Sequence, residues 1–186
     1  MILKRGNPYC CCFDSDLKNA KKVERELAKF LVKHLAVMPS GVYRTQGKDD
    51  RYDLVFVFKN NSVSIEVKND FKCVSTGNVA VEYANTKGHS GIRTTKADYY
   101  LYKIQHLWWT RMWYGEWGYY LISVDDLKKQ IENGLFFRNA PYGGDNEETS
   151  NYLFTLKFVQ DTWDRIDGAC KSSIPVSFRS GKCFIG

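Results

Sequence analysis

The sequence predicts an α/β (α+β) fold in one domain, and three patterns in the 186-residue chain support this expectation. A long amphipathic helical pattern begins near residue 17, a β-hairpin pattern follows at 53–70, and further strand and helix patterns come after it. A chain of this length can bury one sizeable core. We therefore expect a single domain over 1–186, with a core at about 14–124 and a C-terminal elaboration at about 125–186.

The first expected element is a helix from about Leu17 to Leu35. Its apolar residues recur at helical spacing, and the segment 14–16 before it supplies side-chain oxygens for an N-cap. Glu24 lies within the apolar stripe, where a carboxylate without a partner is costly to bury. We therefore expect Glu24 to face a cationic group, and a structural ion pair is the alternative to a functional role.

A β-hairpin is expected at 53–70, after a loop at 38–51 that contains proline and glycine. Two asparagines at 60–61 tolerate the positive φ values of a two-residue turn, and the runs beside them are rich in β-branched and aromatic residues. With this loop, Asp53 would face Lys68 across the hairpin. One face of the hairpin is then continuously apolar and fixes the register: Leu54, Phe56, Phe58, Val63, Ile65 and Val67.

Charged residues gather on the other face of this hairpin. Asp53, Glu66 and Lys68 should project together, because directly opposed residues share a face of the sheet. As diagonal neighbours, Asp53 and Glu66 would have Cα atoms roughly 7–8 Å apart, within reach of one shared cation. Hard divalent ions such as Mg²⁺ prefer oxygen ligands of this kind. A solvated charged edge of the hairpin is the alternative interpretation.

An aspartate followed by Glu-Val-Lys on the next strand resembles the PD-(D/E)xK nuclease superfamily, and the stretch 82–100 resembles small members of it, several from phages. The resemblance covers about residues 14–124 and implies a restriction-endonuclease-like core, with a mixed central β-sheet flanked by helices in α-β-β-β-α-β order. It implies Asp53, Glu66 and the Val67 carbonyl as Mg²⁺ ligands, and Lys68 as the residue that positions or activates the attacking water. It also implies that Glu24 reaches the metal directly or through water. Tyr52 stands where the pattern has proline.

A third strand is expected at 78–83, with Glu82 on the face opposite Val79 and Val81. If this strand pairs beside Glu66, Glu82 is a further candidate metal ligand. An exposed strand glutamate is the alternative.

The segment 85–98 is polar, basic and glycine-containing, and it predicts a phosphate-facing loop followed by a short helix. An ordinary charged surface loop is the alternative, and a lone histidine in such a loop is more often a donor than a catalytic base. The candidate nucleic-acid-binding residues are Lys87, His89, Ser90, Arg93, Thr95 and Lys96.

Four further elements complete the expected scaffold: strands at 98–105, 118–124 and 152–158, and a capped helix at 124–134. Between them, residues 107–117 carry four tryptophans. Tryptophans at this density most often build a core or a partner interface, and the alternative is stacking on bases.

Composition limits the function classes. The net charge of +6 and the aromatic content of 15% suit a phosphate backbone and stacked bases. Six cysteines show no Cys-x-x-Cys zinc spacing, which favours free thiols in a reducing compartment. No run approaches the roughly 20 apolar residues of a membrane span. We expect a cytoplasmic, intracellular protein without a membrane partner, including the case of a phage-infected host cell.

Two function hypotheses follow. The first is a Mg²⁺-dependent DNA endonuclease, with Mn²⁺ as a substitute, of resolvase-like, restriction-like, homing or repair type. The second is a nucleic-acid-binding module that retains the fold without cutting, against which the intact Asp53, Glu66 and Lys68 argue. A homodimer is one expected partner state, because two-fold symmetric DNA targets commonly imply a protein dimer.

Overall fold

The computed structural model describes residues 12–35, 38–44, 52–106, 117–141 and 148–166, with side chains described from residue 18 onward. Among these residues, the strands form a six-stranded sheet and a four-stranded sheet. The tryptophan-rich segment lies outside the described residues except for Trp117.

The six-stranded sheet, called sheet A, has the order β1-β2-β3-β6-β7-β10 and is mixed. Strands β3 and β6 run parallel, whereas the other neighbouring strands run antiparallel. Its strands are β1 (Gly41–Arg44), β2 (Leu54–Val57), β3 (Ser62–Asp70), β6 (Tyr99–Gln105), β7 (Trp117–Ser123) and β10 (Asp164–Arg165).

The four-stranded sheet, called sheet B, is antiparallel and has the order β5-β4-β9-β8. Its strands are β4 (Asn78–Asn85), β5 (Gly88–His89), β8 (Arg138–Ala140) and β9 (Thr149–Thr155). The helices are α1 (Cys12–His34), α2 (Cys73–Thr76), the 3-10 helix η2 (Gly91–Arg93), α4 (Val124–Glu132) and α5 (Leu156–Thr162).

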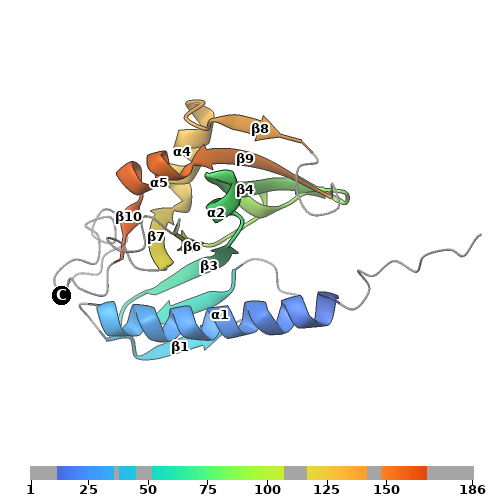
Figure 1. Cartoon of the computed structure of the whole chain (residues 1–186). Coiled ribbons are helices and arrows are strands. Elements are labelled where there is room, and N and C mark those ends of the chain that lie inside the picture. Colours follow the sequence, from blue (N-terminus) through green and yellow to red (C-terminus); the bar gives the residue numbers. More distant parts are fainter. Residues whose placement is uncertain (1–11, 36–37, 45–51, 107–116, 142–147, 167–186) are drawn as a thin grey trace, which may run out of the picture.

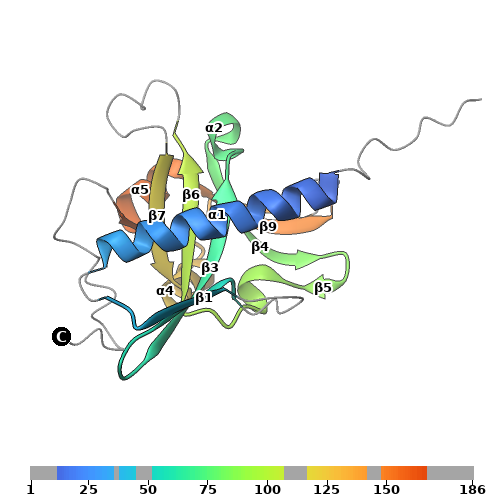
Figure 2. The same ribbon diagram turned by 90° about the horizontal axis from the view of Figure 1, so that it is seen from below.

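These elements form layers on the two faces of sheet A (Figure 1). Helix α1 lies across one face, and seen from below it crosses the strands (Figure 2). Leu27 and Leu31 of α1 pack there with Phe56, Ile65 and Leu101. Sheet B and helices α2, α4 and α5 cover the other face, where one continuous core includes Tyr100, Tyr102, Val81, Leu127 and Phe154. The predicted α+β class, with a mixed central sheet flanked by helices, is therefore confirmed.

The position of three elements differs from the sequence-based expectation. Helix α1 begins at Cys12, so the residues 14–16 that were expected as its N-cap lie within the helix. The expected loop at 38–51 contains strand β1, because Val42 and Tyr43 suit a strand that pairs along β2. Strand β4 belongs to sheet B and not to sheet A. The α-β-β-β-α-β order is still present, with β1, β2 and β3 as its first three strands.

The hairpin of β2 and β3 is confirmed, but its expected register is wrong by two residues. Val57 pairs with Ser62, and the loop has four residues, closed by the Phe58 N–H, which donates to the Asn61 carbonyl at 2.8 Å. Phe58 is buried beneath α1, which anchors the start of the loop. Because the shift is an even number of residues, the apolar and charged faces keep their expected identities.

Candidate active site

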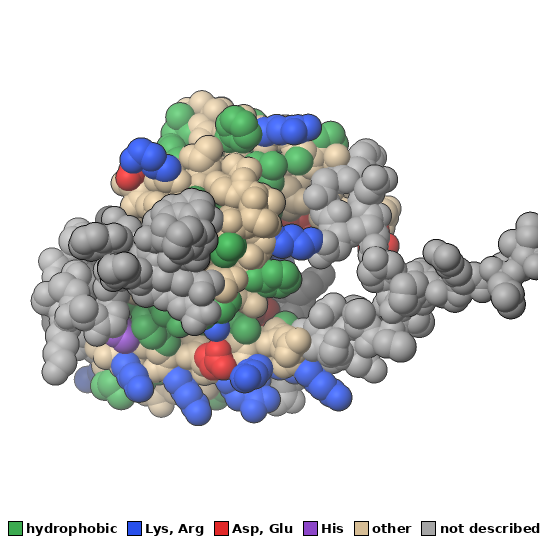
Figure 3. All heavy atoms as spheres, in the orientation of Figure 1, with side chains coloured by type: hydrophobic (Ala, Val, Ile, Leu, Met, Phe, Trp, Pro, Cys, Tyr) green, Lys and Arg blue, Asp and Glu red, His purple; other side chains and the backbone are tan. Residues whose placement is uncertain are grey.

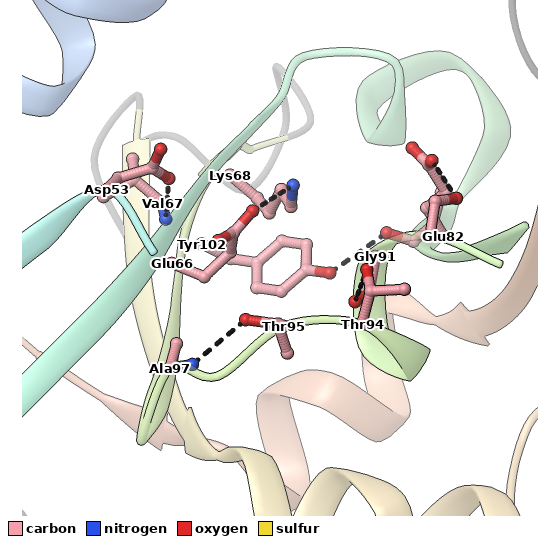
Figure 4. Close-up of polar contacts among 12 residues, drawn as sticks. Asp53, Glu66, Val67, Lys68, Glu82, Gly91, Thr94, Thr95, Ala97 and Tyr102 are labelled. Atoms are coloured by element: carbon pink, nitrogen blue, oxygen red, sulfur yellow. Dashed lines mark hydrogen bonds and ion pairs between the residues drawn. The ribbon is translucent and has the colours of Figure 1, made fainter. Parts of the chain in front are cut away.

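The candidate site begins with an ion pair on β3. Lys68 Nζ lies 2.7 Å from Glu66 Oε1, and the Glu66 side chain is only 13% exposed while that of Lys68 is 33% exposed. Both residues pair with tyrosines of the parallel neighbour, Glu66 with Tyr100 and Lys68 with Tyr102. Figure 4 shows the pair in the space between β3 and the segment that carries Gly91 and Thr95.

Lys68 is held as an ammonium ion in this setting. Burial by itself lowers the pKa of Lys68. The charge of Glu66, the Tyr100 phenol, the hydrogen bond that Lys68 donates to Glu66 and the charge of Asp53 raise it, so the net pKa lies above its usual value. The ammonium also lies 5.9 Å from the centre of the Tyr100 ring. A lysine with a raised pKa is a poor proton acceptor at neutral pH, so it acts through its charge and its N–H donors.

Asp53 precedes β2 and is hydrogen-bonded to the backbone of β3. Its N–H donates to the Ile65 carbonyl at 3.0 Å, and its Oδ2 accepts from the Val67 N–H at 2.7 Å. Burial, and then the negative charge of Glu66, raise the pKa of Asp53 to about 6, although the Val67 hydrogen bond and Lys68 oppose this rise. In Figure 4, Asp53 lies on the other side of the β3 ribbon from the Glu66–Lys68 pair.

Glu24 of α1 contributes to the same electrostatic environment. Burial raises its pKa, the charge of Glu66 adds to the rise, and the cations Arg44, Lys21 and Arg25 lower it. Glu24 in turn raises the pKa of Asp53. The cationic surroundings expected for Glu24 are therefore present, with Arg44 of β1 as the largest favourable charge.

The donor atoms of this region suit a hard cation. In the described part of the chain, no three His, Cys, Asp or Glu side chains are grouped closely enough to hold a metal ion. The chemical fit rests on two carboxylates, Asp53 and Glu66, and the charge of Glu66 raises the pKa of Asp53. Mg²⁺ is commonly bound through one or two carboxylates, with water and substrate phosphate as further ligands, so this donor set is compatible with it.

Glu82 does not lie where the sequence placed it. Its role as a metal ligand required its strand to pair beside Glu66, but β3 pairs with β2 and β6, so the two glutamates are on different sheets. Sequence patterns predict a strand but not its partner. Strand β4 pairs with β9, which lies about 70 residues further along the chain. The Ser90 hydroxyl donates to Glu82 Oε1 at 2.5 Å.

A cavity of about 460 Å³ lies between the two sheets, with Lys68 and Glu82 in its wall. Lys68 and Tyr102 line it from sheet A, and Glu82 and Asn151 line it from sheet B. Tyr102 donates from its hydroxyl to the Ala80 carbonyl at 3.1 Å, which joins the two sheets at the cavity wall (Figure 4).

Sequence reasoning missed several residues that shape the site. Asp70 accepts from the Cys73 N–H at 2.9 Å and from the Ala80 N–H at 3.2 Å, and so fixes α2 and β4 to the end of β3. Tyr100 and Tyr102 surround the Glu66–Lys68 pair. The alternation of these tyrosines along β6 was the available signal, but only the parallel pairing with β3 reveals which residues they face.

The predicted basic loop forms β5 and η2, and its members differ in their surroundings. Arg93 lies over the Tyr83 ring at 4.6 Å, and its guanidinium contacts His89 Nδ1 at 3.1 Å and the Tyr152 hydroxyl at 3.4 Å. Ser90 is bonded to Glu82, and Thr95 Oγ1 accepts from the Ala97 N–H at 3.1 Å. The exposed side chains of this loop include Lys87, His89, Arg93 and Lys96.

Gly91 is required for the path of this loop. Its φ of +52° lies in the left-handed region, and a Cβ atom there would collide with the Glu82 carbonyl. The backbone of η2 therefore packs directly against β4, which holds the loop beside Glu82.

Comparisons with known proteins do not assign this chain to a family. No protein-family model matches the sequence, and no curated protein matches it. A search of solved structures finds a bacterial homing endonuclease, I-Ssp6803I, with 21% identity and a TM-score of 0.41 over 60% of this chain and 71% of that one. A similarity at this level does not establish a shared family. Among the described residues, no helix is both long enough and apolar enough to cross a membrane.

Proposed function

We propose that this protein is a Mg²⁺-dependent DNA endonuclease of the PD-(D/E)xK type, with Mn²⁺ able to replace Mg²⁺. The observation that carries the proposal is the partly buried Glu66–Lys68 ion pair beside a second carboxyl, Asp53, whose pKa is raised to about 6. Perturbed titratable groups gathered along a cavity are typical of catalytic sites. A purely structural surface pair would be exposed and would have no adjacent carboxyl to repel it.

In this proposal Asp53, Glu66 and the Val67 carbonyl hold the metal ion. When bound, Mg²⁺ would polarise the scissile phosphate and lower the pKa of a water molecule. Lys68 remains protonated, because its pKa is raised, and therefore orients the water and offsets the negative charge that develops on the phosphate. Glu24 supports Asp53 and Glu66 from α1 as a further acidic group that a cation would neutralise.

The DNA backbone would lie beside the loop of β5 and η2. Lys87 and Lys96 are its exposed lysines and are proposed as phosphate contacts, with His89 and Thr95 beside them. Ser90 and Arg93 would act mainly by holding the loop, since each already has a polar partner. This loop borders the same segment that carries Glu82, so a strand bound there would approach Lys68 across the cavity.

The decisive test is cleavage of four DNA substrates: plasmid, linear duplex, single strand and four-way junction, each with Mg²⁺ or EDTA. The wild type should cut at least one substrate only with the metal. Lys68→Ala should reduce cleavage by orders of magnitude while changing DNA affinity little, because both carboxylates and the basic loop remain. Lys128→Ala, which removes an exposed lysine of α4, is the matched control and should cut normally.

The same assay separates the enzyme from the binding module. Cleavage by the Lys68→Ala variant at the wild-type rate would overturn the catalytic assignment. Metal-independent DNA binding with no cleavage of any of the four substrates would favour the non-cutting module.

A further inference from the structure

Five cations form a continuous stripe along the outer side of α1, and we name them the α1 stripe: Lys18, Lys22, Arg25, Lys29 and Lys33. They follow one another at intervals of three or four residues, so they lie on one side of a helix with 3.6 residues per turn. All five are exposed. At 1.5 Å per residue, the stripe is about 22 Å long. Figure 3 shows blue side chains gathered along this side of α1.

The α1 stripe is only partly balanced by neighbouring acids. Among the described residues, no ion pair within 4 Å involves its members, and Glu26 of the same helix is bonded instead to Lys103 of β6 at 3.2 Å. Of its members, Arg25 contributes to the cationic surroundings of Glu24. Like charges four residues apart destabilise a helix by about 0.2–0.5 kcal/mol for each pair. The stripe contains three such spacings: Lys18 to Lys22, Arg25 to Lys29, and Lys29 to Lys33. A polyanion would relieve the repulsion within this row.

The α1 stripe is separate from the candidate active site. Leu27 and Leu31 of α1 are buried against one face of sheet A, so the stripe faces away from the sheet. Lys68 lines the cavity on the opposite side of the same sheet, with residues of sheet B. DNA bound along the stripe would therefore not be the segment whose phosphate reaches Lys68.

We propose that the α1 stripe binds the phosphate backbone of a second DNA segment, either a flanking part of the cleaved molecule or another duplex. This inference rests on the proposed function only for the identity of the polyanion. A membrane surface is less suitable, because an interfacial helix inserts its apolar face into the lipid, and the apolar face of α1 is already buried in the protein core.

The test uses the full chain with Lys22→Gln, Lys29→Gln and Lys33→Gln combined, since glutamine keeps helix propensity and removes the charges. Binding to a 30-base-pair duplex is measured by fluorescence anisotropy in EDTA over a range of salt concentrations. The slope of log affinity against log salt should become shallower by about 2.7, or about 0.9 for each of the three lost contacts. The matched control combines Lys59→Gln, Lys128→Gln and Lys157→Gln, three exposed lysines outside α1, and should keep the wild-type slope.

Each outcome decides the proposal. An equal loss of slope in the α1 variant and the control would mean a general charge effect and overturn it. Loss of binding to phosphatidylserine vesicles, with unchanged DNA binding, would assign the stripe to membranes and overturn it as well. Because the binding assay excludes metal, a reduced slope in a protein that never cuts DNA would support the α1 stripe and count only against the nuclease.

Discussion

At the scale of single residues, Asp53 destabilises the fold when it ionises. The carboxyl of Asp53 has its pKa raised from 3.8 to about 6, mainly by burial and then by Glu66. A folded-state pKa above the unfolded one means that ionisation of Asp53 opposes folding. The resulting loss of stability begins near the unfolded pKa and is complete above the folded pKa, and it amounts to about 3 kcal/mol at most.

Asp53→Asn should therefore stabilise the protein in the absence of metal. Asparagine cannot ionise, and its carbonyl oxygen can still accept the Val67 N–H. We expect little difference from the wild type at pH 4, and a rising advantage up to about 3 kcal/mol at pH 7.5. Urea unfolding in EDTA at several pH values measures this difference. A variant that is less stable at every pH would contradict the raised pKa.

Metal affinity should depend on both carboxylates. Calorimetric titration with Mn²⁺ should show binding that Asp53→Ala and Glu66→Ala each weaken at least tenfold, whereas Asp161→Ala on α5 leaves it unchanged. Metal binding requires the ionised carboxylate, so Asp53 should also release a proton at pH 5.5 and much less at pH 8. Wild-type affinity in both site variants would remove the metal from this position.

At the scale of elements, the end of β3 is a junction between the two sheets. Asp70 ends the strand, and its carboxyl accepts backbone N–H groups from α2 and from β4. Burial raises the pKa of Asp70, and these hydrogen bonds oppose the rise. Lys68 is two residues away, so the anchoring of β4 also sets the width of the cavity beside it.

Asp70→Ala should loosen this junction. It leaves the N–H of the buried Cys73 without its acceptor, which costs about 1–3 kcal/mol, and it also removes the acceptor of the exposed Ala80 N–H. We expect a loss of stability in this range and faster hydrogen exchange at Ala80, measured by mass spectrometry or NMR. Asp125→Ala, an exposed residue of α4, is the control and should stay close to the wild type.

The whole molecule depends on strands from the C-terminal third of the chain. Strand β9 pairs with β4 along most of its length, and β10 pairs with β7. Phe154 and Trp163 from this part are buried in the same core as Tyr100 and Tyr102. The segment beyond residue 125 therefore completes both sheets, although the core pattern seen in the sequence ends before it.

A chain that ends at residue 125 should fail to fold cooperatively. Without β9 and α5, the apolar face of β4 and the aromatic side of β6 would be exposed to water. We expect no sharp thermal transition and strong binding of a hydrophobic dye. A chain that ends at residue 166 retains every strand pairing described here and should unfold cooperatively. Cooperative unfolding of the shorter chain would show that its core is independent.

The sequence by itself determined the helix α1, the hairpin of β2 and β3, the strand character of β4, β6, β7 and β9, and helix α4. It did so because helical and strand periodicities are local properties of the chain. The asparagines at 60–61 marked the place of the turn, although the loop spans 58–61 and not the expected two residues. The alternation on β3 also placed Glu66 and Lys68 on the face opposite Ile65, and this assignment survived the change of register because the shift was even.

Only the tertiary structure decided which strands are neighbours. The division into two sheets, the parallel pairing that sets Tyr100 beside Glu66, and the capture of β4 by β9 all join residues far apart in the chain. Each depends on which apolar faces can be buried together, a global property that no local pattern contains. The same limit explains the error over Glu82 and the failure to foresee Asp70: their environments are created by partners that the sequence does not place next to them.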